Sequence, residues 1–222
     1  MRHTDDAQGD QSVIGSATDK KIPKAVIKRL SLYSRVLQNL EILDRDKVSS
    51  RELAQRLGLN SAQVRKDLAY FGQFGVPGLG YYVSDLRQNI KRILGTDRGV
   101  RIGLVGVGNL GAALMSYGGF ARQGFHIVAA FDSDKRKVGA TKGSVMIYDA
   151  AEMEKVIRRE AIDIAILAVP ADHAQPVCDQ LVGAGITALL NFVPVHLQVP
   201  EHVKVHYVDL SIEIESLSYY LR

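Results

Sequence analysis

Two patterns of hydrophobic and polar positions divide the chain. From Lys24 to Asp44, apolar residues recur at spacings of three and four, which predicts an amphipathic helix. After Gly99, runs that are almost wholly apolar, such as Ile162–Val169, alternate with helical stretches, a pattern typical of strands buried in a parallel sheet. We therefore predict an α/β protein with a helical domain over residues 20–95 and a doubly wound parallel sheet over residues 99–209.

The helical domain contains a predicted helix-turn-helix. Helices over Ser50–Leu57 and Ala62–Phe71 are joined by a short turn that begins at Gly58. The glycine-rich, aromatic stretch Gly72–Tyr82 then predicts a tight β-hairpin, or wing, and Ser84–Leu94 predicts another amphipathic helix. This order of elements indicates a winged-helix domain.

The α/β domain begins with a predicted strand over Val100–Val105, a helix over Asn109–Ala121 and a strand over His126–Phe131. The remaining pattern predicts a weak strand, a helix, a strand, a helix and two further strands, in the order Val145–Tyr148, Ala150–Arg159, Ile162–Val169, Asp172–Val182, Ile186–Phe192 and Lys204–Val208. Alternation of strands and helices predicts helices on both faces of the sheet.

The two ends of the chain differ in character. Residues 1–19 are polar and show no period, which predicts a disordered tail. Residues 210–222 form a predicted helix that is apolar on two sides, which is more than one domain usually covers. We interpret this segment as a dimerisation helix in a homodimer, with packing on its own sheet as the alternative.

Charge is distributed unevenly along the chain. The formal net charge is +4, but residues 20–95 carry 15 Lys and Arg against 6 Asp and Glu, whereas residues 96–222 carry 12 against 14. A basic N-terminal domain suggests a polyanionic partner for that domain alone. Because the domain also contains a helix-turn-helix, we expect this partner to be double-stranded DNA.

The second helix of the pair presents the residues expected to contact DNA. Arg and Lys contact phosphates or base edges, and Gln reads an adenine edge. The candidate DNA-binding residues are, on this helix, Ser61, Gln63, Arg65, Lys66 and Tyr70 and, in the wing, Gly78, Gly80 and Tyr81. The alternative is a small helical domain with a solvated basic face.

A GxGxxG motif follows the first strand of the α/β domain. In a Rossmann fold, Gly106 would make the tight turn, Gly108 would admit a pyrophosphate and Gly111 would let helix and strand pack closely. Asp132 ends the next predicted strand, where a carboxylate binds the adenosine ribose and repels a 2′-phosphate, so NAD(H) is favoured over NADP(H). The alternative is a glycine-rich turn without a ligand.

Ligands of doubly wound sheets bind at the carboxyl ends of the strands. The candidate residues for binding NADH and NAD⁺ are therefore Gly106, Val107, Gly108, Asn109, Leu110, Gly111, Asp132, Ala168, Val169, Pro170, Asn191 and Phe192. Only residues 210–222 follow this domain, which leaves no room for the substrate domain of a dehydrogenase. A nicotinamide-dependent oxidoreductase with a helical N-terminal extension is the alternative.

Other chemistry has little support. No Ser-His-Asp order or catalytic-cysteine signature is present, and His202 and His206 lie in an extended stretch, so we expect neither catalytic residues nor a metal site. The single cysteine, Cys178, fits a reducing compartment, and no apolar run is long enough to span a membrane. We expect a cytoplasmic protein without a membrane partner.

The motifs together resemble the Rex family of bacterial redox-sensing transcriptional repressors. The resemblance runs from about Ile22 to Tyr220 and rests on the segments PKAVIKRLSLYSRVL (23–37), QVRKDLAYFG (63–72), GLGY (78–81), GVGNLG (106–111), FDSDKRKVG (131–139), AVP (168–170), NFVP (191–194) and VD (208–209). It implies a homodimer on a palindromic operator, with C-terminal helices exchanged between Rossmann domains. NADH would release the DNA, and NAD⁺ would compete without releasing it.

The resemblance also implies a switch formed by Arg35, Tyr117 and Asp209. Asp209 would contact Tyr117, a further cofactor-site residue, in one state and Arg35 of the other subunit in a second state, which NADH favours. The alternative is that Arg35 is solvated or contacts a phosphate. Two positions depart from the family pattern: Val76-Pro77 occupies the wing tip, where relatives often carry a basic residue, and Leu210 stands where some carry Phe.

Overall fold

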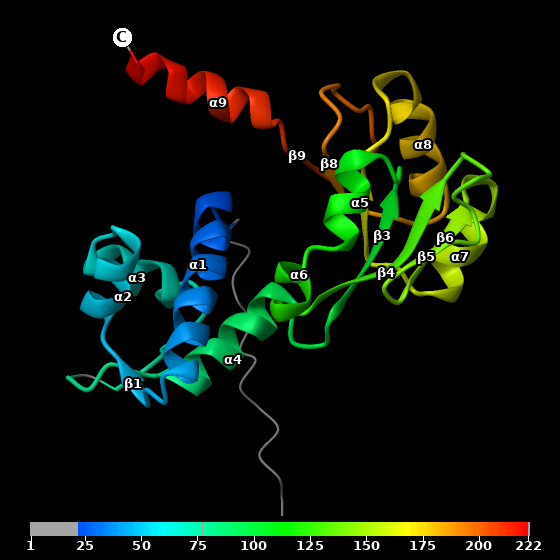
Figure 1. Cartoon of the computed structure of the whole chain (residues 1–222). Helices are drawn as coiled ribbons and strands as arrows, with labels where there is room; N and C mark the ends of the chain where they lie inside the picture. The colour runs from blue at the N-terminus through cyan, green and yellow to red at the C-terminus, as the bar shows by residue number, and fades with distance from the viewer. Residues whose placement is uncertain (1–21, 77, 222) are drawn as a thin grey trace, which may run out of the picture. The chain divides into compact units, whose positions relative to one another are not determined.

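The computed structural model describes residues 22–76 and 78–221 and divides into two compact units between Leu94 and Gly95 (Figure 1). The predicted disordered tail, residues 1–19, and Pro77 of the wing tip lie outside the described residues. Each unit has a hydrophobic core of its own.

The first unit consists of helices and a very short sheet. The Ser49 hydroxyl accepts a hydrogen bond from the Glu52 amide (3.0 Å) at the start of one helix, and Asn60 accepts one from the Ala62 amide (2.8 Å) at the start of the next. Gly58, with a φ of 64°, ends the first of these helices, so the two form the predicted helix-turn-helix. The elements are α1 (Lys24–Ile42), β1 (Lys47–Val48), α2 (Ser50–Leu57), α3 (Ser61–Ala69), β2 (Tyr81–Tyr82) and α4 (Val83–Leu94).

The core of this unit lies between α1 and α4 and between α2 and α3. Each helix contributes apolar residues spaced by three or four, which gives it one apolar face. The buried side chains are Leu30, Tyr33, Leu37, Leu40, Leu53, Val64, Leu68, Leu86 and Ile90, with others around them.

The segment between α3 and α4 differs from the predicted hairpin. β2 pairs in antiparallel fashion with β1, and a single bridge between Val76 and Gly80 closes the loop before it. Gly75 and Gly80 have φ values of 85° and 86°, so the chain turns sharply instead of forming a ladder with itself. The pattern does not predict Lys47–Val48 as a strand because two residues are too few to show a period.

The second unit is built around a seven-stranded sheet among the described residues. All neighbouring strands are parallel except for the edge pair β5 and β6. Apart from β5, the strand order is 3-2-1-4-5-6, that of the Rossmann fold, which confirms the predicted doubly wound sheet. In spatial order the strands are β5 (Thr141–Lys142), β6 (Val145–Asp149), β4 (Phe125–Asp132), β3 (Val100–Val105), β7 (Ile164–Leu167), β8 (Ala188–Asn191) and β9 (Lys204–Tyr207).

Helices cover both faces of this sheet. A 3₁₀ turn (Ala150–Glu152), α7 (Met153–Arg159) and α8 (Ala171–Gly183) lie on the face that buries Phe131. Cys178 of α8 is fully buried in this core, and burial raises the pKa of its thiol. This cysteine is therefore a core residue and not a reactive group.

The opposite face is covered by α5 (Asn109–Met115) and α6 (Gly119–Arg122). The pattern predicts a single helix over Asn109–Ala121, and the structure corrects this. The break coincides with Gly118 and the glycine that follows it, each about 1 kcal/mol less favourable than Ala inside a helix. Tyr117 lies within the break.

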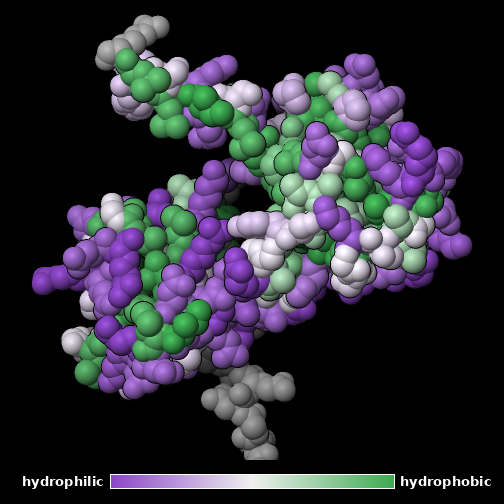
Figure 2. Space-filling model, viewed as in Figure 1, coloured by the Kyte–Doolittle hydropathy of each residue, from purple (hydrophilic) through white to green (hydrophobic). Residues whose placement is uncertain are grey.

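The chain ends in α9 (Leu210–Ser218), which continues as a 3₁₀ turn over Tyr219–Leu221. Asp209 begins α9, because its carboxylate accepts a hydrogen bond from the Ser211 amide (2.9 Å). The structure does not support packing of this helix on its own sheet, because α9 and the 3₁₀ turn contain no buried side chain. Apolar colour covers much of this terminal segment in Figure 2. Its large apolar side chains are 60–86% exposed and are Leu210, Ile212, Ile214, Leu217, Tyr219, Tyr220 and Leu221.

Candidate functional sites

The glycine-rich loop lies at the carboxyl ends of β3 and β7, where the strand order reverses. Gly106 has a φ of 94°, and a Cβ there would overlap the carbonyl oxygen of Ala168. A Cβ on Gly111 would overlap the carbonyl oxygen of Gly106, so this glycine lets α5 begin close to the loop. At Gly108 a Cβ would meet nothing within 4 Å, so the loop is open beside this residue.

Asp132 ends β4 beside this loop and is held by three donors. One carboxylate oxygen accepts from the Val107 amide (2.9 Å) and the Lys137 ammonium (2.9 Å), and the other accepts from the Asp134 amide (2.8 Å). Burial raises the pKa of Asp132, but the three donors outweigh it, so the pKa lies below its ordinary value. Asp132 is therefore a carboxylate at neutral pH that is joined directly to the glycine-rich loop.

The segment after β7 lies beside the glycine-rich loop, whereas the side chain at the end of β8 makes hydrogen bonds within its own loop. Ala168–Pro170 borders the glycine-rich loop, as predicted. The Asn191 amide nitrogen donates to the carbonyl oxygens of Val193 and Val195, and its side-chain oxygen accepts from the Val193 amide. This fully buried side chain shapes its own loop, so the contact with a nucleotide that the sequence predicts for Asn191 stays a prediction. Phe192 packs half-buried against the core on the α5 side of the sheet.

Tyr117 is not brought together with the glycine-rich loop within one chain. It lies at the end of α5 far from the loop, and its ring meets Phe120 edge-on with centroids 5.1 Å apart. It borders a cavity of about 450 Å³ lined by Arg101 and His126, which lie near the amino ends of β3 and β4. The glycine-rich loop is at the opposite, carboxyl ends of these strands.

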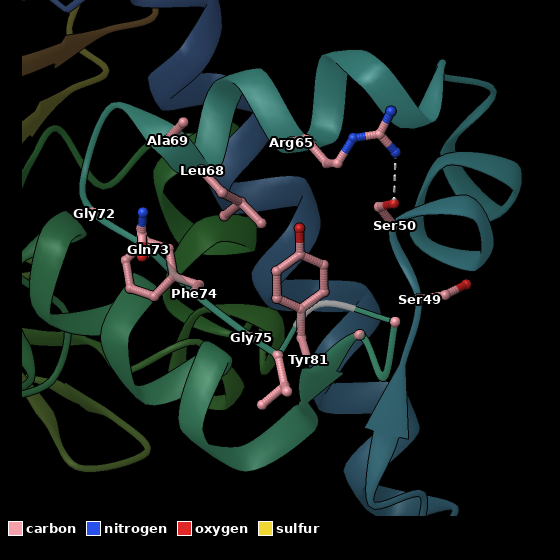
Figure 3. A pocket seen from close by; sticks show the side chains of 13 residues that line it. Ser49, Ser50, Arg65, Leu68, Ala69, Gly72, Gln73, Phe74, Gly75 and Tyr81 are labelled. Carbon is pink, nitrogen blue, oxygen red and sulfur yellow. Dashed lines mark hydrogen bonds between the residues drawn. The ribbon is translucent and has the colours of Figure 1, made fainter.

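In the first unit, α3 presents Arg65, Lys66 and Tyr70 as exposed side chains, and Ser61 is half-buried in its first turn. Figure 3 shows that the Arg65 guanidinium donates to the hydroxyl of Ser50 at the start of α2, over 3.1 Å. Arg65 borders a hollow of about 590 Å³ between α3, the start of α2 and the wing. Arg65 of α3 thus lies at the edge of a concave surface.

The wing residues do not all face outward. Tyr81 is only 8% exposed and belongs to the core, whereas Tyr82 is exposed, because successive side chains of β2 point to opposite faces. Tyr81 thus packs in the core and also lines the hollow beside α3, as Figure 3 shows, and its contact with DNA stays a prediction. Gly78 and Gly80 both have positive φ and serve the turn.

Asp67 organises α3, although the sequence pattern does not single it out. Its fully buried carboxylate accepts hydrogen bonds from Arg29 (2.5 and 2.8 Å), Tyr33 (2.7 Å) and Gln63 (2.7 Å). The amide nitrogen of half-buried Gln63 is therefore already engaged by Asp67, and its contact with an adenine edge stays a prediction. A signal existed, since Arg29 and Tyr33 are four residues apart on one helix and Gln63 and Asp67 on another.

The described part of the chain shows neither a metal-binding cluster nor a membrane-spanning helix. Among residues 22–76 and 78–221, no group of three or more His, Cys, Asp or Glu is arranged to hold a metal ion. No helix in the same ranges is both long and apolar enough to cross a membrane.

Two family models match the chain. Residues 21–69 match the family described as putative DNA-binding protein N-terminus, and residues 97–195 match the CoA binding domain family. The first match covers the helix-turn-helix, and the second covers the glycine-rich loop and most of the parallel sheet.

Curated proteins resemble the chain over nearly its whole length. The redox-sensing transcriptional repressor Rex of Syntrophobacter fumaroxidans is 48% identical over 202 residues, which are 90% of this chain and 96% of that protein. The protein of the same name from Exiguobacterium sp. is 44% identical over 207 residues, 93% of this chain and 95% of that protein.

Solved structures of a Rex-family repressor also match this chain over most of its length. RSP in complex with β-NAD⁺ and operator DNA matches with a TM-score of 0.85 at 40% identity, over 91% of this chain and 94% of that one. RSP in complex with β-NADH matches with a TM-score of 0.80 at 39% identity, over 91% and 95%. RSP is described as a Rex-family repressor, and the curated relatives are named as repressors and not as enzymes. This chain therefore belongs to the Rex family of redox-sensing transcriptional repressors.

Proposed function

We propose that this protein is a repressor that binds palindromic operator DNA as a homodimer and releases it when NADH binds, so that it responds to the ratio of NADH to NAD⁺. One observation carries the proposal: a basic helix-turn-helix unit and a Rossmann sheet stand in one chain, in the arrangement of elements shared with RSP. Because a repressor must meet its operator, we infer that it acts in the cytoplasm.

On the DNA side, α3 is the element that would enter the major groove. Its exposed Arg65, Lys66 and Tyr70 are available to base edges and phosphates. Ser61 and the backbone of the wing at Gly78–Gly80 would contact the sugar-phosphate chain. The excess of basic residues in 20–95 supplies the attraction to phosphates that does not depend on sequence.

On the nucleotide side, the open loop Gly106–Gly111 would face the pyrophosphate of NAD(H), and the Asp132 carboxylate would accept hydrogen bonds from the adenosine ribose. The apolar side chains of Val169 and Phe192 would line part of the proposed NAD(H) site. When bound, the dinucleotide supplies a nicotinamide ring that is charged in NAD⁺ and neutral in NADH. The adenosine and pyrophosphate are common to both, so discrimination must come from the residues near the ring.

The homodimer is proposed from α9. Its large apolar side chains are exposed along a helix that has no buried residue in a single chain. A second copy of the same chain would cover them, and exchange of the two helices would satisfy both copies at once. Two-fold symmetry then matches a palindromic operator.

The switch is proposed from three residues. Arg35 is exposed on α1, Tyr117 is exposed between α5 and α6, and Asp209 caps α9. Asp209 would contact Tyr117 in one state and Arg35 of the other subunit in the second. A ligand shifts such an equilibrium only through its different affinities for the two states.

Fluorescence anisotropy of a labelled duplex from the region upstream of the protein's own gene tests this function. NADH is titrated at fixed NAD⁺ and fixed salt, because affinity for DNA depends steeply on salt. We expect NADH to release the duplex and NAD⁺ alone to leave it bound. DNA binding that is indifferent to NADH would contradict the proposal, and steady consumption of NADH with a small-molecule substrate would favour an oxidoreductase.

A further inference from the structure

Three consecutive cations follow Asp132 in the loop after β4, and each is paired with a different carboxylate. All three carboxylates lie at or just beyond the carboxyl ends of β4 and β6, the edge at which the adenosine ribose is proposed to bind. The pairs are Lys135 with Asp149, Arg136 with Asp134 (2.7 Å) and Lys137 with Asp132 (2.9 Å).

The loop that carries these cations is held by its own hydrogen bonds. The carboxylate of Asp134 accepts from the Arg136 amide (3.0 Å), and its carbonyl accepts from the Lys137 amide (2.9 Å). Asp149 lies opposite Asp132 in the register of β6 with β4. The turn therefore directs the Lys137 side chain back to the end of β4, where its ammonium reaches Asp132.

This pairing has a consequence for a dinucleotide that carries a 2′-phosphate. Such a phosphate would meet the anionic Asp132, while the cations that favour it are each occupied by a carboxylate. If Asp132 lost its charge, the partners of Lys135 and Arg136 would remain in place. Lys137 alone would lose its ion-pair partner, and its side chain, 37% exposed, would remain beside the proposed ribose site.

We propose that Lys137 is a second residue that determines dinucleotide specificity, masked by Asp132 as the chain stands and able to bind a 2′-phosphate once the Asp132 charge is removed. The inference rests on the proposed function, because it takes the end of β4 as the ribose site. The inference goes beyond the proposed function, because it assigns the choice between NADH and NADPH to the ion pair of Lys137 with Asp132 and not to Asp132 alone. A charge-assisted hydrogen bond between ammonium and phosphate is the interaction that Lys137 would supply.

The test compares NADPH and NADH affinities by calorimetry in the full-length protein and its variants. Asp132→Asn removes the charge but keeps an oxygen that accepts from the Val107 amide. We expect the ratio of NADPH to NADH affinity to rise in Asp132→Asn by about tenfold or more, and to fall back most of the way in Asp132→Asn/Lys137→Met. The matched control, Asp132→Asn/Lys135→Met, should keep the raised ratio, because the ammonium of Lys135 pairs with Asp149.

The proposal would be overturned if Asp132→Asn/Lys137→Met kept the same raised ratio of NADPH to NADH affinity as Asp132→Asn. The loss of repulsion between Asp132 and the 2′-phosphate would then be enough to explain NADPH binding. Lys137→Met by itself provides a second measurement on a largely unperturbed fold. It should lower NADPH affinity more than NADH affinity, because it leaves the Asp132 charge without its cation, and equal losses would also overturn the proposal. Failure of the wild-type protein to bind either dinucleotide would instead refute the proposed function, and this inference with it.

Discussion

Arg29 of α1 and Asp67 of α3 form a two-pronged ion pair, with the Nε and Nη2 atoms of the guanidinium 2.5 and 2.8 Å from the two carboxylate oxygens. Asp67 has no solvent exposure, and the Tyr33 hydroxyl and the Gln63 amide donate to the same carboxylate. The pair fixes the helix that is proposed to read DNA against the long first helix. It therefore connects the packing of the first unit with its function.

Breaking this pair should destabilise the first unit. Arg29→Met keeps the aliphatic bulk but leaves a buried carboxylate without its cation, which costs about 3 kcal/mol in the free energy of unfolding. Urea unfolding followed by circular dichroism measures the loss. The matched control is Arg56→Met, which removes only the exposed pair with Glu52 and should cost less than about 0.5 kcal/mol. Equal losses in the two variants would contradict the importance of the Arg29–Asp67 pair.

The same carboxylate predicts a dependence of stability on pH. Burial raises the pKa of Asp67, but hydrogen bonds from Arg29, Tyr33 and Gln63 outweigh it and leave the pKa below its ordinary value of 3.8. A group whose pKa is lower in the folded state contributes stability that is complete above the unfolded pKa and is lost as the pH falls through the folded pKa. Unfolding free energies measured downward from neutral pH should therefore fall more steeply below about pH 4 in the wild type than in Asp67→Asn. If the unfolding free energies of the wild type and Asp67→Asn fell in parallel with pH, the lowered pKa of Asp67 would not contribute to the pH dependence.

The sequence predicts well what depends on local pattern. Val100–Val105 and Ser50–Leu57 have the predicted bounds. A mostly apolar run and a helix that ends at a left-handed glycine both depend on residues that are neighbours in the chain. The glycine-rich loop and Ala168–Pro170 meet as predicted, because the carboxyl ends of neighbouring parallel strands share one edge.

The pattern does not show which candidate side chains are already engaged inside the protein. The four-residue spacing of Gln63 and Asp67 permits their hydrogen bond, but it does not show that Asp67 is buried and paired with Arg29 of α1. Asn191 stands at a strand end, as a ligand would, but the loop that follows needs its amide for three hydrogen bonds. Tyr81 is predicted to face DNA, but its pairing with Val48 places it in the core. A period of apolar residues indicates neither the burial nor the hydrogen-bond partners of these polar and aromatic side chains.

The placement of α3 predicts how DNA binding responds to charge removal. Lys66→Ala should weaken operator binding, because the exposed ammonium is proposed to lie in the major groove. A base contact would cost about 1–3 kcal/mol and relax specificity at one position, whereas a phosphate contact would weaken all sequences and reduce the salt slope by about 1. Anisotropy titrations at several salt concentrations separate the two cases. Lys155→Ala removes an exposed cation from α7 in the other unit and should change neither quantity.

The exposed face of α9 predicts the oligomeric state. Ile214→Asp and Leu217→Asp place charges among apolar side chains that are 67% and 66% exposed in the single chain, so they should not unfold the domain. If a second copy covers them, both variants should dissociate the dimer in sedimentation velocity and lose affinity for a two-half-site operator. Glu215→Gln, on the same helix, should remain dimeric. A wild-type protein that sediments as a monomer would end this interpretation.

The last prediction concerns communication between the two units. Arg35 is exposed on α1, and Asp209 uses one carboxylate oxygen to accept from the Ser211 amide at the start of α9. Asp209→Asn keeps an oxygen for this cap but removes the charge that would pair with Arg35. In Asp209→Asn and in Arg35→Ala we expect NADH to bind within a few-fold of its wild-type affinity but to lose most of its effect on operator affinity. A coupling of roughly 1–3 kcal/mol, or 5–150-fold, is the range that two-site regulation typically needs. The reversed pair, Arg35→Asp with Asp209→Arg, should regain part of the response, because the attraction between the two positions is restored. If both single variants release DNA with NADH as the wild type does, the Arg35–Asp209 pair is not the switch, and Arg35 is then better explained as a solvated or phosphate-contacting residue of a basic helix.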